Sequence, residues 1–304
     1  MLDGIDIVYW INLDRSNDRR DNMNAMFRDD AFKNIKNERF SAIDYKVSNV
    51  LSRFNLNKSE YKNSEPEYAC FLSHLETIRQ FANSDLPDDS VALIMEDDAT
   101  LEYKSYWKTS IENVIKNAPS DWEIIMLNYM FGEGTKLPDL SKFSDYEKNK
   151  TRFFSALSYL IQKSTAKRMI NKMYRSGKYE LDPSVNSHHA DEYLFTVLST
   201  YAYKYPFFTY KTENDSYLHP THLDNHKNCK LYIAKSLYGI DESKEGFSTI
   251  DGSFDFGYKR IILYLIFAVF LALTLFLFQK PIHYYFQLFK TKSKSSSSFK
   301  FSTK

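Results

Sequence analysis

The stretch Val91-Ala92-Leu93-Ile94-Met95-Glu96-Asp97-Asp98 joins five apolar residues directly to three consecutive carboxylates. An unbroken apolar run is typical of a strand that is buried on both faces, as in a parallel sheet. Open α/β sheets bind ligands outside the carboxyl ends of their strands. Adjacent carboxylates repel one another unless a cation lies close, and Mg²⁺ and Mn²⁺ prefer carboxylate oxygens. The stretch therefore predicts a buried strand that ends at a metal site, with a solvated acidic turn as the alternative.

Apolar patterns on both sides of this stretch predict alternating strands and helices. Further strands are expected at 5–11, 39–43, 122–127, 153–161 and 205–208. Helices are expected around Met23, Met26 and Phe27, at 66–82, at about 105–117, from Ser164 to Gly177 and at 191–200. The helix at 66–82 begins with a capping-box pattern, Ser64-Glu65-Pro66-Glu67. The alternation predicts an α/β fold with a Rossmann-type, mostly parallel sheet.

Charge is distributed unevenly along the 304 residues, whose net charge is only +1. Residues 259–304 hold eight basic residues and no acidic one. The remaining 32 basic and 39 acidic residues give residues 1–258 a net charge of −7. An acidic body argues against nucleic acid as the main partner. The two cysteines, Cys70 and Cys229, are too few to indicate a disulfide scaffold or a zinc site.

The segment 261–278 (IILYLIFAVFLALTLFLF) contains 18 residues and no charge. A helix of this length spans a hydrocarbon core of about 30 Å, and it lacks the polar face of an ordinary core helix. We expect a transmembrane helix at 259–280, after an extension or linker at 219–258. The basic, Ser/Lys-rich tail at 281–304 cannot build a core of its own.

The N-terminal residues MLDGID have two acids and no basic residue, so they do not form a signal peptide. This predicts a single-pass membrane protein with a C-terminal anchor and with residues 1–258 in the cytosol. The lysines after the span favour the opposite orientation, because cytoplasmic flanks are usually the more basic ones. A lumenal domain therefore stays open as the alternative.

Several motifs occur in the order of a known enzyme family. They are INLDRSNDRR (11–20), EYACFLSHLETI (67–78), ALIMEDDATL (92–101), FSALSYLI (154–161) and ADEYL (190–194). Together they resemble glycosyltransferase family 25, which includes lipooligosaccharide galactosyltransferases and the domains that galactosylate collagen hydroxylysine. The resemblance covers roughly residues 5–218.

The resemblance implies a GT-A glycosyltransferase domain at 1–218. It also implies an inverting, metal-dependent hexosyltransferase, most often one that uses a nucleotide-sugar donor such as UDP-galactose. The acceptors of such enzymes include lipid-linked sugars, protein hydroxyls and glycans, the last as in lipopolysaccharide biosynthesis. The competing hypothesis is a catalytically inactive relative that binds a glycan or nucleotide sugar at the membrane. The intact acidic motifs argue against an inactive relative, because clustered carboxylates repel one another and are unfavourable without a function.

The acidic motif matches the position of the family's metal ligands, and Glu96, Asp97 and Asp98 are the candidates. Mn²⁺ is the expected cation, with Mg²⁺ as the alternative. Either would neutralise the charge that develops on the leaving diphosphate. Among the later histidines, His219 and His222 are further candidates for a third ligand.

Donor binding is assigned to the first motif and to the middle of the predicted helix 66–82. Asn12 follows the first strand, and a guanidinium from Arg15, Arg19 or Arg20 can bind phosphate oxygens bidentately. Ser73 and His74 match the family's Ser-His pair. The alternatives are a solvated basic first turn of a helix and a structural, hydrogen-bonded histidine.

An inverting transfer needs a general base that accepts the proton of the acceptor hydroxyl, and a carboxylate commonly does this. Asp191 and Glu192 are the candidates, because their motif lies well downstream of the donor half. An ordinary acidic first turn of a helix is the alternative, since acids are favourable there.

The anchor hypothesis makes a direct prediction. The intact chain should remain with the membrane fraction after carbonate extraction, because 261–278 is uniformly apolar. Recovery in the aqueous phase would refute the anchor. The sequon at Asn149 tests orientation: a gel-mobility shift that disappears in Asn149→Gln would place the domain in the lumen.

Overall fold

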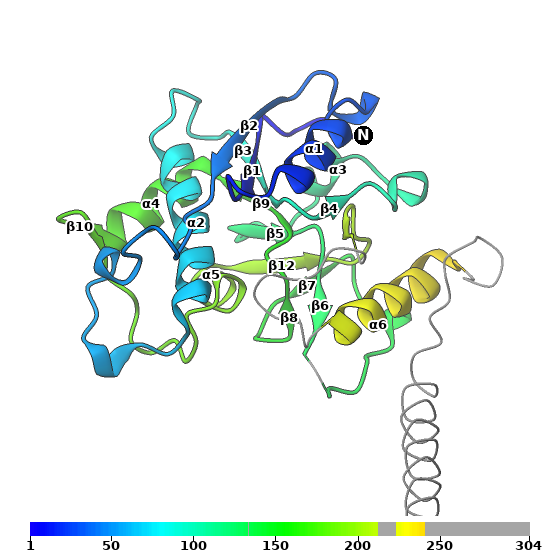
Figure 1. Cartoon of the computed structure of the whole chain (residues 1–304). Helices are drawn as coiled ribbons and strands as arrows, with labels where there is room; N and C mark the ends of the chain where they lie inside the picture. Colours follow the sequence, from blue (N-terminus) through cyan, green and yellow to red (C-terminus); the bar gives the residue numbers. More distant parts are fainter. Residues whose placement is uncertain (133, 212–222, 241–304) are drawn as a thin grey trace, which may run out of the picture. The chain divides into compact units, whose positions relative to one another are not determined.

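A mixed sheet forms the centre of the structure, which is a computed structural model that describes residues 1–132, 134–211 and 223–240 (Figure 1). In these residues the sheet has seven strands in the order β2-β1-β3-β9-β5-β12-β7. The strands are β1 (Ile7–Asn12), β2 (Lys36–Ser41), β3 (Val91–Glu96), β5 (Ile124–Met126), β7 (Tyr146–Lys148), β9 (Ser158–Gln162) and β12 (Thr200–Tyr203). The predicted α/β class is confirmed.

The sheet is more mixed in direction than the sequence predicts. Strands β2, β1 and β3 are parallel, as are β5 and β12, whereas β9 runs antiparallel to both β3 and β5. Strand β7 is antiparallel to β12 at the edge. No crossover helix lies between β5 and β9, and a parallel connection would need one. A contiguous apolar run therefore correctly predicted burial but not strand direction.

Helices cover both faces of the sheet. They are α1 (Asn17–Met26), α2 (Glu65–Ala82), α3 (Ile111–Lys116), α4 (Lys163–Met173), α5 (Ala190–Val197) and α6 (Leu223–Ile233). Side chains of α2, α4, α5 and α6 share one hydrophobic cluster, and those of α1 and α3 belong to the other. The unbroken apolar run in β3 follows from this layering: Ala92 and Ile94 face the first cluster, while Leu93 and Met95 face the second.

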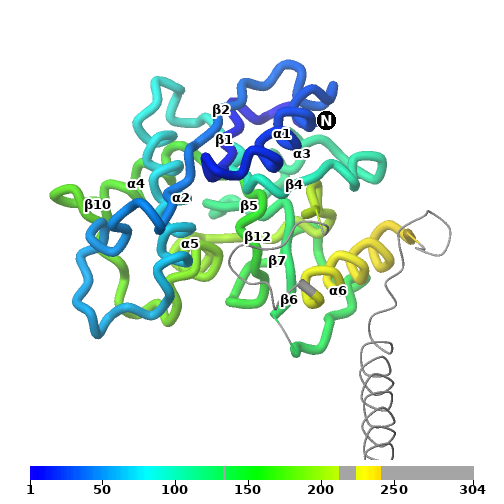
Figure 2. Tube along the Cα trace, viewed as in Figure 1, coloured from blue at the N-terminus to red at the C-terminus, as the bar shows by residue number. Residues whose placement is uncertain are grey.

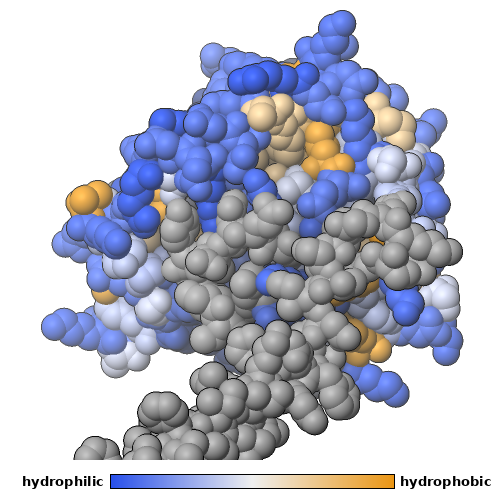
Figure 3. Space-filling model, turned by 45° about the vertical axis from the view of Figure 1, so that its right-hand side comes forward, coloured by the Kyte–Doolittle hydropathy of each residue, from blue (hydrophilic) through white to orange (hydrophobic). Residues whose placement is uncertain are grey.

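Short elements complete the described chain (Figure 2). Three two-stranded pairs are β4 (Ala99–Thr100) with β13 (Thr209–Tyr210), β6 (Met130–Phe131) with β8 (Phe153–Phe154), and β10 (Tyr174–Arg175) with β11 (Lys178–Tyr179). Single 3₁₀ turns occur at Asp30–Phe32, Leu51–Arg53, Lys58–Glu60, Lys104–Tyr106 and Leu140–Lys142, and a π-helical turn at Ala234–Tyr238. On the face drawn in Figure 3, the surface of the described residues is mostly hydrophilic, and apolar side chains appear only in small patches.

Helix α2 agrees closely with its prediction. The capping box is present: the Ser64 side chain binds the backbone of the first turn, and Glu67 returns a bond to the Ser64 backbone. Pro66 lies in the first turn, where its missing N–H costs nothing. This local agreement matters because α2 carries Cys70, Ser73 and His74 to the candidate site.

Four predicted elements differ in the structure. The expected helix at 105–117 is only a 3₁₀ turn plus α3, because Ser110 caps a new helix. The expected strand 153–161 is interrupted at Ser155, whose φ is 96°. Residues 205–208 are not a strand, and Phe207 instead bonds the carbonyl of Leu127. Helix α4 ends at Met173 rather than near Gly177, because a β-hairpin begins there.

Residues 1–240 form one compact unit. Part of the predicted extension belongs to it, since Cys229 and Ile233 of α6 lie in the first hydrophobic cluster. The predicted transmembrane helix at 259–280 and the tail at 281–304 fall outside the described residues, as do His219 and His222. Within the described part, no helix has both the length and the apolar character needed to cross a membrane.

Candidate active site

The candidate site lies at the carboxyl ends of β1 and β3. These strands are paired in parallel with Ile11 opposite Glu96, so Asn12 and the acidic triplet meet at one edge of the sheet. A pocket of about 230 Å³ opens there. Seven predicted residues line it: Arg15, Arg19, Ser73, His74, Glu96, Asp97 and Asp98. The structure thus brings residues of the first motif, of α2 and of the acidic triplet together.

Asp97 is braced from both sides. Nδ2 of Asn12 donates to Oδ2 of Asp97 at 2.7 Å, and Nη1 of Arg19 donates to Oδ1 at 2.8 Å. All three residues are buried. Asn12 also donates to the Ser16 carbonyl and accepts a bond from Arg39, so its amide is fully engaged. Asn12 and Arg19 therefore hold the acidic turn in place, and the predicted donor contact of Asn12 stays a prediction.

Asp98 is in a different state from its neighbour. Its Oδ1 atom is buried and has no hydrogen-bond partner among the described residues. Nη1 of Arg19 is 3.9 Å from Oδ2 of Asp98. Burial and the negative charge of Glu96 raise the pKa of Asp98 to about 7. A buried, unsatisfied carboxylate oxygen is unfavourable in isolation, and the position fits an oxygen ligand of a hard divalent cation.

Glu96 is held by His74, which is fully buried on α2. Nε2 of His74 lies 3.1 Å from Oε1 of Glu96, and Nδ1 lies 3.1 Å from the hydroxyl of Tyr159 on β9. Burial acts to raise the pKa of Glu96. The hydrogen bond from His74 and the positive charges nearby outweigh it, so the pKa is lowered. His74 thus has a positioning role at the metal motif, which its Ser-His motif alone does not reveal.

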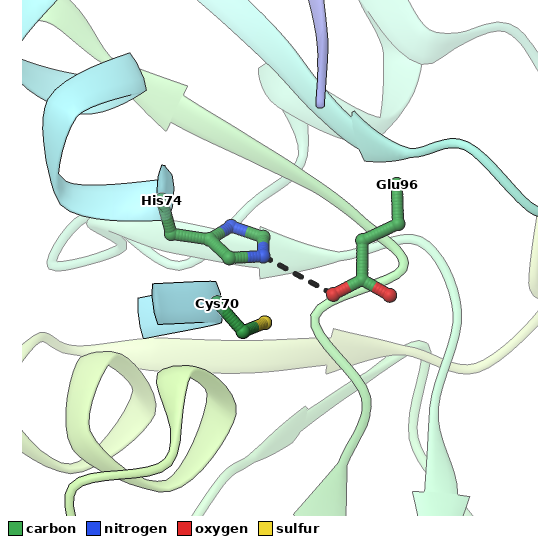
Figure 4. A group of neighbouring side chains, drawn as sticks. All are labelled: Cys70, His74 and Glu96. Carbon is green, nitrogen blue, oxygen red and sulfur yellow. Dashed lines mark hydrogen bonds and ion pairs between the residues drawn. The ribbon is translucent and has the colours of Figure 1, made fainter. Parts of the chain in front are cut away.

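Two further residues at this site were not assigned from the sequence. Cys70 lies one helical turn before His74, and its thiol points toward His74 and Glu96 (Figure 4). The i, i+4 spacing of Cys70 and His74 was a signal that they share a helix face. His226 on α6 adds a positive charge that lowers the pKa of Glu96, and its ring packs against Tyr210. His226 lies in a segment of the sequence that contains no recognised motif.

Asp191 is held rigidly at the start of α5. Its Oδ2 accepts a bond from the Ser155 N–H at 2.8 Å, and its Oδ1 accepts one from the Glu192 N–H at 2.9 Å. Burial raises the pKa of Asp191. Ser155 has a left-handed φ of 96°, which is strained for a residue other than glycine and is typical of functional sites. Its hydroxyl is anchored to Asn128 at 2.8 Å.

The loop from Ser155 to Leu157 connects Asp191 to the acidic triplet. The Leu157 carbonyl accepts a bond from the Glu96 N–H at 2.9 Å, two residues beyond the contact between Ser155 and Asp191. The electrostatics agree: burial, and then the charges of Glu96, Asp191, Asp98 and Asp97, raise the pKa of the Cys70 thiol. Four carboxylates from two separate motifs therefore act on one thiol, although Asp191 is not among the residues that line the pocket.

Glu192 differs from Asp191. The interaction with His189 lowers the pKa of Glu192, and the charged atoms of the two side chains are 3.9 Å apart. His189 also lies 3.0 Å from Glu67 at the start of α2. The structure thus engages Glu192 in a charge network and leaves Asp191 beside the acidic triplet.

The remaining predicted donor residues have local partners. Arg15 lines the pocket and binds Asp44 at 2.7 Å. Arg20 binds Asn17 and does not line the pocket. The Ser73 hydroxyl donates to the Ala69 carbonyl and accepts the Ile43 N–H at 2.9 Å, so it fastens α2 to the loop after β2.

Comparison with protein families gives a match. The sequence model of glycosyltransferase family 25 (LPS biosynthesis protein) matches residues 5–185. The chain belongs to glycosyltransferase family 25. The matched region contains the predicted donor and metal residues up to Asp98, and it ends before Asp191. No curated protein matches the chain.

Two adjacent histidines before α5 allow a pH test of this family 25 glycosyltransferase. Hydrogen bonding to Glu192 and Glu67 raises the pKa of His189 to about 9, whereas burial lowers the pKa of His188 to about 4. The stabilisation from His189 is fully present below its ordinary pKa of 6.5 and is lost as pH rises through about 9. His189→Gln should therefore cost about 1 kcal/mol or less at pH 7.5 and nearly nothing at pH 10.

His188→Gln is the matched control. His188 is neutral in both the folded and unfolded states between pH 7.5 and 10. The loss in free energy of unfolding caused by His188→Gln, measured by urea denaturation, should not change over that pH range. An unchanged cost for His189→Gln would contradict the charged state assigned to His189.

Proposed function

We propose that the chain is a metal-dependent, inverting hexosyltransferase that moves galactose from UDP-galactose to a hydroxyl of a glycan or lipid-linked acceptor. The observation that carries the proposal is the unsatisfied, buried Oδ1 of Asp98 in a pocket that also contains Glu96 and two arginines. Family membership supports sugar transfer. The choice of galactose rests on the resemblance to galactosyltransferases.

The donor end of the pocket combines cationic and polar groups. Arg15, Lys46 and the acidic triplet all line the pocket. A guanidinium suits diphosphate oxygens, and Arg15 has an exposed side chain held in place by Asp44. The diphosphate of a nucleotide sugar therefore fits between the arginine and the carboxylates.

Glu96 and Asp98 are the residues that would hold a divalent cation such as Mn²⁺, with Asp97 as their brace. When bound, the cation neutralises negative charge that develops on the leaving diphosphate. The chain's own contribution is geometric, since Arg19 and Asn12 fix the acidic turn and His74 fixes Glu96. This prearrangement avoids reorganisation during the reaction.

Asp191 is the proposed general base. Burial makes its carboxylate a stronger base, and two backbone N–H groups fix its direction. The acceptor oxygen forms a bond to the anomeric carbon while the bond from that carbon to the diphosphate breaks. The hydroxyl proton passes to Asp191, and UDP leaves. A single displacement of this kind inverts the anomeric centre.

The segment 261–278 is proposed to anchor the enzyme, which suits an acceptor that is itself bound to a membrane. The inactive-relative hypothesis is less well supported, because a binding protein has no need for a strained Ser155 that positions a carboxylate beside the acidic triplet.

Asp98→Asn should abolish UDP release from UDP-galactose and remove the stimulation by Mn²⁺. Its melting temperature should be equal to or higher than that of the wild type, because a repelled, unsatisfied carboxylate is neutralised. Asp97→Asn is the contrasting variant. It breaks a buried pair with Arg19 and should cost about 3–5 kcal/mol of stability. Full turnover of the wild type in EDTA, or an active Asp98→Asn, would refute the metal role.

Asp191→Asn should lower single-turnover transfer by about 10²–10⁴-fold, which is the usual loss of general-base assistance. Its affinity for UDP, measured by calorimetry, should stay near normal. Glu192→Gln should have a much smaller effect on transfer, since Glu192 is engaged with His189. If only Glu192→Gln loses activity, the roles within the pair are reversed. If both retain full turnover, the base lies elsewhere.

A further inference from the structure

Cys70, His74 and Glu96 form a compact group of three potential metal ligands from two elements. Their ligand atoms, the thiol sulfur, an imidazole nitrogen and a carboxylate oxygen, all lie within 4.8 Å of one another. Figure 4 shows the three side chains pointing toward a common space. Two of them come from one face of α2 and the third from the carboxyl end of β3, and all three line the pocket.

The group has the support that metal sites usually show. Cys70 and His74 are one helical turn apart, so the rigid helix sets their separation. Nδ1 of His74 is bonded to the Tyr159 hydroxyl at 3.1 Å, which fixes the ring and directs Nε2 toward Glu96. A histidine ligand usually has its other ring nitrogen bound in this way. The Cys70 sulfur has no hydrogen-bond partner in the described residues and is free of a disulfide.

The ligand set favours a borderline or soft cation over Mg²⁺ or Mn²⁺. Thiolate and imidazole suit Zn²⁺, whereas Mg²⁺ and Mn²⁺ prefer oxygen ligands. Bond lengths of about 2.0–2.3 Å around tetrahedral Zn²⁺ imply ligand atoms roughly 3.3–3.7 Å apart. The distance between His74 and Glu96, 3.1 Å, is already close to this range, and the sulfur of Cys70 lies within 4.8 Å of both ligand atoms.

We propose that Cys70, His74 and Glu96 bind Zn²⁺ or a chemically similar cation, with the fourth position open to the pocket. Cys70 loses its thiol proton to solvent when the cation binds. The site differs from the Asp98 position in its ligands and shares only Glu96 with it. It does not depend on the proposed transferase reaction, because binding requires neither donor nor acceptor.

The rival interpretation is a structural histidine with a thiol beside it. In that case His74 only hydrogen-bonds Glu96, and Cys70 fills space at the pocket wall. The two interpretations differ in one observable: only a coordinated thiolate gives a charge-transfer band with a bound transition metal.

Titration of the metal-free, full-length chain with Co²⁺ tests the proposal. One equivalent should produce a near-ultraviolet thiolate-to-cobalt band, and added Zn²⁺ should abolish it. Cys70→Ser should lose the band. Cys229→Ser should keep it, because Cys229 is buried on α6 near Phe131 and is the only other cysteine. No band in the wild type, a band that survives in Cys70→Ser, or one that depends on Cys229 would each overturn the site.

Tyr159→Phe is a second variant that leaves all three ligands in place. It removes only the hydroxyl that orients His74, so Co²⁺ affinity should fall by about 10–100-fold, as for other outer partners of metal ligands. Thermal unfolding of each metal-free variant checks that it is folded. Unchanged Co²⁺ affinity in Tyr159→Phe, together with a retained fold, would contradict the role given to His74.

Discussion

The buried pair between Arg19 and Asp97 is the interaction on which the site depends. Three consecutive carboxylates at the end of a buried strand repel one another, and Arg19 pairs with Asp97 at hydrogen-bond distance. Asn12 takes the second oxygen of Asp97. With both oxygens of Asp97 bound, the turn is fixed, and Glu96 and Asp98 on either side of it are directed into the pocket. A buried pair of this kind contributes more to specificity of geometry than to net stability.

The charges at the site are arranged in two groups. Asn12, Arg19 and His74, from β1, α1 and α2, hold Asp97 and Glu96, yet the pKa values of these carboxylates differ: that of Glu96 is lowered, whereas burial raises those of Asp97, Asp98 and Asp191. Separate environments thus give neighbouring carboxylates different properties, which is how one site can contain both ligands and a base. A carboxylate held by a neighbouring side chain also occurs at the start of α5, where Glu192 is paired with His189.

Local sequence patterns predicted the parts of this molecule that depend on local physics. The apolar run of β3, the capping box of α2 and the motifs at the ends of β1 and β3 were all placed correctly, because burial and helix starts are encoded within a few residues. The direction of β9 was not, since it depends on a connection whose path no periodicity reveals. The contact of Asn12 with Asp97 and the position of Cys70 near Glu96 were not predicted either, because each involves a side chain distant in sequence.

The insertion of β9 between β3 and β5 has a consequence for how the chain folds during synthesis. All the residues that line the pocket have been synthesised once Asp98 is added. The free edge of β3, however, gains its neighbour β9 only when Gln162 has been added. Until then an apolar strand presents unpaired backbone groups, which is the usual template for intermolecular association. His74 therefore gains its hydrogen-bond partner Tyr159 late, and a nascent chain that pauses before β9 is the form most exposed to aggregation.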